Sequence, residues 1–165
     1  MSNLYRKNVG IVVFNQDKKV LMCARAEKDE NNWQFPQGGM EAEEDVLTAA
    51  KRELQEETAL TSVKVVAQFP YALKYDCPED VRQKFAQLGC YYKGQEQYWV
   101  LLYFDGKNEE IDFFTNPLEI EFKDYKWEDI EKAPLEIVEF KKNVYEKIAD
   151  FFAPIISKYE VEKND

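Results

Sequence analysis

The 165-residue chain contains no histidine and only three cysteines, Cys23, Cys77 and Cys90, which are widely spaced and form no C-x-x-C pair. An odd number of scattered cysteines does not build a disulfide framework. Without histidine, a common zinc ligand is also missing. We therefore expect reduced, mostly buried thiols and neither a disulfide scaffold nor a zinc site.

Long apolar stretches are missing as well. No segment approaches the roughly 18 apolar residues that a membrane-spanning helix needs, and the polar segment Met1–Asn8 lacks the apolar core of a secretion signal. We find no repeat, low-complexity tract or Gly/Ser linker. Because 45% of the residues are hydrophobic, enough for one core, we expect a single cytoplasmic domain spanning residues 1–165, with no membrane partner and no prediction of oligomeric state.

Positive charge is in deficit, with 22 Lys and Arg against 32 Asp and Glu and a net charge of -10. Proteins that bind nucleic acid along its backbone present broad basic surfaces, so we expect no DNA partner and only local binding of any polyanion. Abundant carboxylates without histidine favour hard cations such as magnesium, calcium or manganese over softer metals.

Hydrophobic patterning predicts a sheet with helices on its faces. Apolar, β-branched or aromatic runs predict strands at residues 9–14, 20–23, 63–69, 97–104 and 125–127. The Gly- and Pro-containing segment 31–39 predicts a shaped loop before a helix at 44–58, and apolar residues from Phe140 to Ile156 recur at helical spacing, with a bend at Pro154 as an option. Segment 77–93 permits no assignment. This order of elements favours an α/β or α+β sandwich.

Glu53, Glu56 and Glu57 stand at positions i, i+3 and i+4 of the predicted helix 44–58, so their carboxylates converge on one arc. That arc borders the apolar side of the helix, formed by Val46, Ala50 and Leu54. Clustered like charges repel one another, and negative charge near a helix C-terminus opposes the helix dipole. A bound divalent cation would relieve both strains. The alternative is an ordinary solvated acidic face.

The same segment carries a longer motif of a glycine, five residues, a glutamate, seven residues and then R-E-U-x-E-E-x-G-U, where U is apolar. It is matched by Gly38, Glu44, Arg52, Glu53, Leu54, Glu56, Glu57 and Leu60. This pattern resembles the Nudix box, with the single departure of Ala59 in place of the last glycine. The resemblance implies the Nudix fold, an α/β/α sandwich with a mixed central sheet and flanking helices.

The resemblance also implies a metal-dependent hydrolase. Glu53, Glu56 and Glu57, with the Gly38 carbonyl, would bind magnesium, or manganese as an alternative, while Arg52 and Glu44 brace the helix. Bound metal neutralises phosphate charge and lowers the pKa of water that attacks phosphorus. Glu121 aligns with a glutamate that serves as catalytic base or further metal ligand, and Glu119 is a competing candidate. The expected catalytic residues are Glu53, Glu56, Glu57 and Glu121.

The resemblance extends over most of the chain and is similar to bacterial RNA pyrophosphohydrolases and asymmetric dinucleoside tetraphosphate hydrolases. It is carried by the segments YRKNVG, WQFPQGG, QEQYW and VEFKKNVY, with Lys7 and Glu96 as departures from those families. By matching, the expected substrate-binding residues are Arg6, Arg25, Gln37, Gln95, Gln97, Val138, Phe140 and Lys141, with Lys142 as a further candidate. Val138 and Phe140 would clamp a base, although packing of the C-terminal helix is the competing explanation.

We therefore expect magnesium-dependent hydrolysis of a nucleotide polyphosphate, either the 5′-triphosphate end of RNA or diadenosine tetraphosphate. One rival is a Nudix-fold module that senses a nucleotide without cutting it. Such a module would lack one of the metal-binding glutamates of the box, and all of them are present in this sequence. A non-enzymatic acidic scaffold explains the composition but not the spacing of the box.

Overall fold

A computed structural model describes residues 4–26 and 32–161 and shows a mixed sheet centred on two long strands. Strand β1 (Tyr5–Phe14) runs parallel to β7 (Gly94–Phe104), with pairs from Tyr5–Gly94 to Phe14–Tyr103. Strands β5 (Val63–Gln68) and β6 (Leu73–Asp76) pair antiparallel with β7. Parallel neighbours require a long crossover, and here that crossover contains β2 to β6 and two helices.

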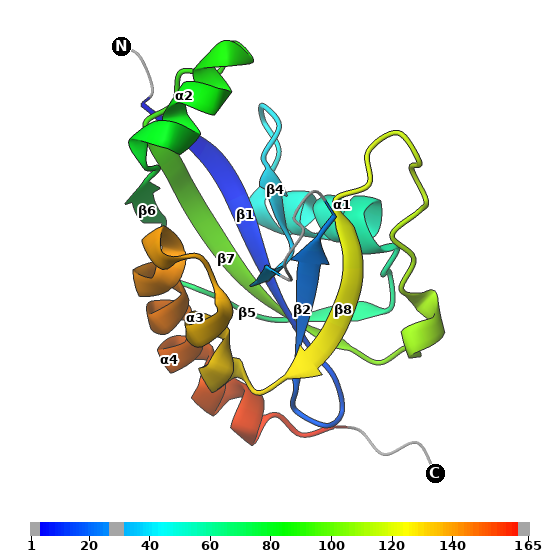
Figure 1. Cartoon of the computed structure of the whole chain (residues 1–165). Helices are drawn as coiled ribbons and strands as arrows, with labels where there is room; N and C mark the ends of the chain where they lie inside the picture. Colours follow the sequence, from blue (N-terminus) through cyan, green and yellow to red (C-terminus); the bar gives the residue numbers. More distant parts are fainter. Residues whose placement is uncertain (1–3, 27–31, 162–165) are drawn as a thin grey trace.

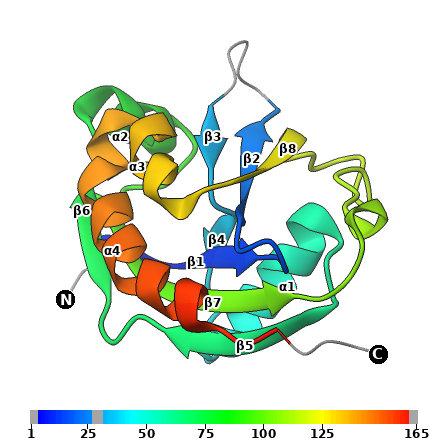
Figure 2. The ribbon, with the colours of Figure 1, turned by 90° about the horizontal axis from the view of Figure 1, so that it is seen from below.

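The second part of the sheet extends from the other side of β1. Strand β2 (Val20–Arg25) pairs antiparallel with β1, β3 (Trp33–Gln34) and β8 (Phe122–Glu128). Strand β4 (Gln37–Gly39) pairs with the first half of β1. In Figure 2, β2, β3 and β8 run across the direction of β1, β7 and β5, so the sheet is strongly twisted.

Helices cover both faces of the sheet (Figures 1 and 2). Helix α1 (Val46–Thr58) lies on one face and α4 (Lys142–Lys158) on the other. Helix α2 (Glu79–Gln87) and the short α3 (Ala133–Glu136) lie on the α4 side of the molecule in Figure 1. Single 3-10 turns stand at Asn108–Glu110, Ile130–Lys132 and Glu139–Lys141.

Alternation along β1 separates two hydrophobic cores. Val12 and Phe14 pack in the core beneath α4, whereas Val9, Ile11 and Val13 pack in the core beneath α1, as expected when successive side chains point to opposite faces. Gly10 lies on the α4 side, where a β-carbon would come within 2.5 Å of the Trp99 ring. Glycine at this position lets the large ring lie flat on the strand.

The α/β/α sandwich with a mixed sheet is confirmed, while several boundaries differ from the prediction. Strands β1, β2 and β8 are longer than their apolar runs, because polar residues at their ends still pair in the ladder. Part of the predicted loop 31–39 forms β3 and β4, although residue 31 lies outside the described residues. Helix α1 begins at Val46, not at residue 44, because Asp45 is its N-cap.

The remaining differences concern helices. The unassigned segment 77–93 contains α2, which has no buried residue and so gave no periodic apolar signal. The expected inclusion of Phe140 in the C-terminal helix was wrong, because Phe140 lies in a separate 3-10 turn before α4. Helix α4 continues through Pro154 to Lys158. Within residues 4–26 and 32–161, no helix combines the length and apolar character that crossing a membrane requires.

Candidate active site

Helix α1 presents its acidic residues because its other side is anchored in the core. Asp45 caps the N-terminus by accepting a 2.7 Å hydrogen bond from the Thr48 backbone N–H. Ala49, Ala50 and Leu54 are fully buried against the sheet. The helix ends at Ala59, which adopts a left-handed conformation with φ of 69° and donates its N–H to the Gln55 carbonyl. The glutamates therefore lie at the edge of the buried face.

These glutamates line an open cleft of about 940 Å³. One wall is α1 with β4, and the other parts come from β1, β2, β3, β7, α2, the segment before β8 and the first residue of β8. The lining residues are Arg6, Asn8, Arg25, Gln34, Gln37, Gly38, Gly39, Arg52, Glu53, Gln55, Glu56, Glu57, Ala59, Phe85, Gln95, Thr115, Asn116, Glu119, Glu121 and Phe122.

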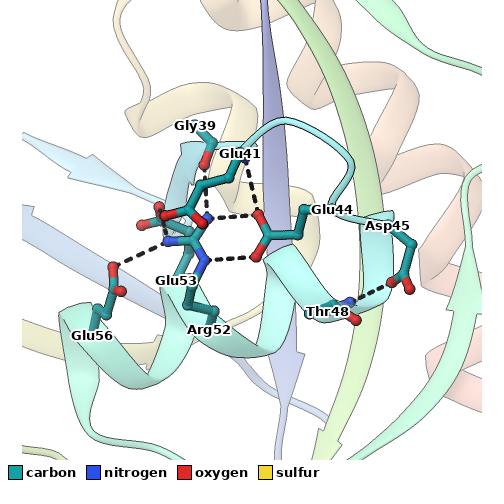
Figure 3. A network of polar contacts seen from close by, with 8 residues as sticks. All are labelled: Gly39, Glu41, Glu44, Asp45, Thr48, Arg52, Glu53 and Glu56. Atoms are coloured by element: carbon teal, nitrogen blue, oxygen red, sulfur yellow. Dashed lines mark hydrogen bonds and ion pairs between the residues drawn. The ribbon is translucent and has the colours of Figure 1, made fainter.

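Arg52 ties this part of α1 to the preceding loop (Figure 3). Its Nε and Nη2 lie 2.7 and 2.8 Å from the two carboxylate oxygens of Glu44, and Nη2 also donates to the Gly39 carbonyl at 3.0 Å. Its Nη1 contacts Glu53 at 2.9 Å and Glu56 at 3.2 Å. Hydrogen bonds from Arg52 and from the Glu41 backbone N–H lower the pKa of Glu44 to about 2. The predicted bracing role of Arg52 and Glu44 agrees with these contacts.

Glu53 and Glu57 are held in a partly desolvated environment. Burial raises the pKa of Glu53, against the opposing effect of Arg52. Burial, together with the charges of Glu53 and Glu121, raises the pKa of Glu57 well above its usual value. The Glu57 Oε2 atom is buried and has no hydrogen-bond partner among the described residues. An unpartnered buried carboxylate oxygen is costly, and a cation would compensate it.

Gly38 makes room for this arrangement, because a β-carbon there would lie 2.1 Å from the carboxyl carbon of Glu53. Across residues 4–26 and 32–161, no three His, Cys, Asp or Glu side chains are gathered around one point that could hold a metal ion. Glu53 and Glu56 instead point toward Arg52. Carboxylate and carbonyl oxygens are nevertheless the donor set that suits magnesium, and the unpartnered Glu57 oxygen lies in the same cleft.

The structure brings most of the sequence-predicted residues together. Arg6, Arg25, Gln37, Gln95 and both competing acids, Glu119 and Glu121, line the same cleft as the α1 glutamates. The Arg6 guanidinium lies over Gly39, where a β-carbon would come within 2.2 Å of Nη2. Glu121 acts electrostatically on Glu57, whereas no such effect is found for Glu119. Both acids are therefore candidates, and Glu121 is the one whose charge contributes to the raised pKa of Glu57.

Val138, Phe140 and Lys141 do not line this cleft. Lys141 is 8% exposed, and its Nζ lies 5.8 Å from the ring centroids of both Tyr75 and Phe140. The Tyr75 and Phe140 centroids are 5.7 Å apart. Burial, then the positive charge of Arg25, lowers the pKa of Lys141 to about 8. Arg25, which lines the cleft, is thus near enough to Lys141 for their charges to interact.

Gln97 does not line the cleft either. It is 1% exposed, and its Nε2 donates 3.0 Å hydrogen bonds to Asn8 Oδ1 and Gln37 Oε1. The prediction missed several lining residues, among them Asn8, Phe85 and Thr115. Asn8 could have been found, because it is two residues from Arg6 in a strand and so points to the same face. Phe85 and Thr115 lie in segments without a usable periodic signal.

Comparison with known proteins gives consistent matches. A family model described as NUDIX domain matches residues 4–148. Nudix hydrolase 26, chloroplastic, of Arabidopsis thaliana is 40% identical over 151 residues, covering 90% of this chain and 69% of that protein. An RNA pyrophosphohydrolase of Pelagibacter ubique is 38% identical over 156 residues, covering 92% of this chain and 94% of that protein.

Solved structures share the fold at lower sequence identity. The dihydroneopterin triphosphate pyrophosphohydrolase of E. coli superposes with a TM-score of 0.67 at 20% identity, covering 90% of this chain and 99% of that one. An Ap4A hydrolase of C. elegans, solved as a binary complex, gives 0.62 at 19% identity, covering 90% and 98%. These likenesses concern the arrangement of the sheet and its helices.

Proposed function

The chain belongs to the Nudix hydrolase family, whose relatives include pyrophosphohydrolases acting on phosphoanhydride bonds, and we propose that it is a magnesium-dependent hydrolase of nucleotide polyphosphates. Its candidate substrates are the 5′-triphosphate end of RNA and diadenosine tetraphosphate. The observation that carries the proposal is that the α1 glutamates line the same cleft as Arg6, Arg25 and Glu121. Carboxylates that could bind a cation and guanidinium groups that could bind phosphate therefore line the same cleft.

Glu53, Glu56 and Glu57, with the Gly38 carbonyl, would hold the magnesium ion, and manganese is an alternative. When bound there, the ion would offset phosphate charge and lower the pKa of a coordinated water. Because Arg52 contacts both Glu53 and Glu56, these two carboxylates would keep some of their hydrogen bonds to Arg52. The buried Glu57 oxygen has no hydrogen-bond partner within the part of the chain that the structure describes, so a bound cation would stabilise this carboxylate most.

Glu121 is the proposed acceptor of the proton from the attacking water, with a further ligand role as the alternative. It lines the cleft, and its charge acts on Glu57. Glu119 lines the same cleft and competes for this role. A base must come within about 3 Å of the water that it deprotonates, directly or through one water.

Arg6, Arg25, Gln37 and Gln95 are proposed to contact phosphate oxygens in the cleft, since each supplies donors to anionic oxygen. Lys141 extends this set beyond the cleft wall. Its pKa is lowered by burial and by Arg25, with no carboxylate among the causes. A phosphate group bound near both side chains would be attracted by both positive charges.

Phe140 and Val138 are proposed as the base-binding residues next to this cationic pair. Phe140 already faces Tyr75, and an aromatic platform contributes roughly 1 to 3 kcal/mol per stacked base. Between the two candidate substrates, the RNA 5′ end has the stronger support. The Pelagibacter ubique relative named as an RNA pyrophosphohydrolase aligns over nearly its whole length, whereas the Ap4A hydrolase is similar in fold alone.

The test incubates purified protein and magnesium with each substrate and measures release of pyrophosphate or of the split nucleotides. Glu57→Gln should lose at least about a hundredfold in kcat, a magnitude typical of removing charge stabilisation at a reacting centre. Glu43→Gln is the matched control, because Glu43 is an exposed acid next to the same helix and does not line the cleft.

Equal turnover by Glu57→Gln and the parent would exclude the metal-site assignment. Binding of both substrates by the parent without hydrolysis of either would instead favour the nucleotide-sensing module.

A further inference from the structure

Three side-chain amides are joined by hydrogen bonds beside the cleft, and two of them, Asn8 and Gln37, line it. Asn8 on β1 and Gln97 on β7 are direct neighbours in the parallel ladder, and they are only 3% and 1% exposed. Gln97 Nε2 donates to Asn8 Oδ1 and to Gln37 Oε1, both at 3.0 Å. Gln37 lies on β4, which pairs with β1. Gln37 also lines the cleft.

The direction of these hydrogen bonds has a chemical consequence. An amide nitrogen has two N–H groups, and in Gln97 each is directed at an oxygen of a neighbouring amide. The oxygen of Gln37 is thereby turned toward Gln97, so its amide nitrogen is the part of the group left to face a ligand. A flipped Gln37 would oppose two N–H donors and leave buried polar groups unpaired, which is costly.

We propose that Asn8 and Gln97 are positioning residues that hold Gln37 as a hydrogen-bond donor toward a phosphate oxygen of the substrate. Gln97 acts through Gln37 and does not touch the substrate. The orientation also prevents the Gln37 oxygen from serving as a metal ligand. This inference rests on the proposed function, because it assumes that a polyphosphate occupies the cleft.

The test compares two substitutions that add the same negative charge at neighbouring positions. Gln97→Glu removes both donors, so Gln37 is released to turn its oxygen outward. Asn8→Asp keeps an oxygen that accepts the hydrogen bond from Gln97. The direction of the hydrogen bonds from Gln97 to its two neighbours therefore stays the same. We expect Gln97→Glu to raise KM about tenfold, the effect of losing one hydrogen bond to a charged group, with a small change in kcat. Asn8→Asp should raise KM by much less.

A double-substitution cycle separates positioning from general damage. In the Gln37→Met background, Gln97→Glu should produce no further rise in KM, because the donor that it positions is already absent. Equal effects of Asn8→Asp and Gln97→Glu would overturn the proposal by showing that charge alone matters. Additive effects of Gln37→Met and Gln97→Glu would overturn it as well.

A second readout keeps the inference distinct from the proposed function. Binding of inorganic triphosphate by calorimetry should weaken about tenfold in Gln97→Glu, whether or not the protein hydrolyses RNA ends. If the parent binds triphosphate but cuts neither substrate, the proposed function fails while this comparison still decides the role of Gln97. Gln97→Met, neutral and similar in size, replaces Gln97→Glu if thermal unfolding shows that the charged variant is not folded, with the same expectation.

Discussion

Ala59 is an alanine held in the left-handed region, with φ of 69°, at the end of α1. Glycine adopts this conformation without a steric cost, whereas alanine is strained there. Ala59→Gly should therefore raise the free energy of unfolding by about 1 kcal/mol, measured by urea denaturation. Ala50→Gly, inside the same helix, should lower it by a similar amount or more. A loss of stability in both variants would contradict this account.

Glu57 combines a buried oxygen without a partner and a raised pKa. In metal-free protein at neutral pH, Glu57→Gln should stabilise the fold by about 1 kcal/mol, a rise in Tm of roughly 2 to 4 °C. The gain should shrink as the pH falls toward the ordinary glutamate pKa of 4.5, because the folded carboxyl then accepts a proton.

Magnesium provides the complementary measurement. It should raise the Tm of the parent, since a ligand that binds only the folded state stabilises it, and should have a smaller effect on Glu57→Gln. A larger magnesium shift in the variant than in the parent would argue against Glu57 as a ligand.

Lys141 has a pKa lowered to about 8 by burial and by Arg25. Its ammonium is present below this pH and is lost above it, so the contribution of Lys141 to phosphate binding should fade as the pH rises through about 8. We expect KM to increase between neutral and alkaline pH, and Lys141→Arg, which stays protonated, to remove that increase. Parallel pH profiles for parent and variant would show that Lys141 does not contact the substrate.

Among the elements, Arg52 helps to join α1 to β4, because its guanidinium contacts the Gly39 carbonyl as well as three carboxylates. A lysine cannot reproduce this planar set of donors. Arg52→Lys should lower both Tm and kcat, the latter by roughly tenfold or more, because small displacements of catalytic groups are costly. Lys51→Arg, the exposed neighbour, is the control. Full activity of Arg52→Lys would contradict this account, because it would show that the planar set of contacts is not needed to position the catalytic groups.

Elements with a periodic apolar side could be predicted from the sequence, and those without one could not. Helix α1 and the long strands bury one or both faces, so their patterns were visible. Helix α2 buries nothing, and short strands such as β3 depend on pairing with β2 more than on their own composition. The cap at Asp45 shows the same limit, because the start of α1 is set by a single side-chain hydrogen bond.

For the whole molecule, the net charge of -10 disfavours an extended basic surface, so we expect only a few cations to contact the substrate. Three cations, Arg6, Arg25 and Lys141, are proposed to contact phosphates. Each neutralised single-strand phosphate contributes about −0.7 to the dependence of log affinity on log salt, so a slope of about −2 is expected. Short and long 5′-triphosphate RNAs should give the same slope when KM is measured against salt. A steeper slope for the longer RNA would indicate an extended basic path.

The sequence also predicted most of the candidate site at this scale, because the box places several of the proposed metal ligands on one helix. The sequence did not show which residues line the cleft and which are buried beside it. Gln97 and Gln95 are two residues apart in one strand and point to the same face, yet Gln95 lines the cleft and Gln97 is covered by neighbouring amides. Such a distinction depends on which side chains of other strands lie above each position.

Strand β1 finally sets a limit on how this protein can vary. Arg6, Asn8, Val12 and Phe14 share one face of the strand because they are separated by even numbers of residues. Deleting or inserting one residue between Asn8 and Val12 would turn the cleft residues toward α1 while leaving the core residues in place. A change in the length of this part of β1 would therefore keep both sets of residues on their present face only in steps of two.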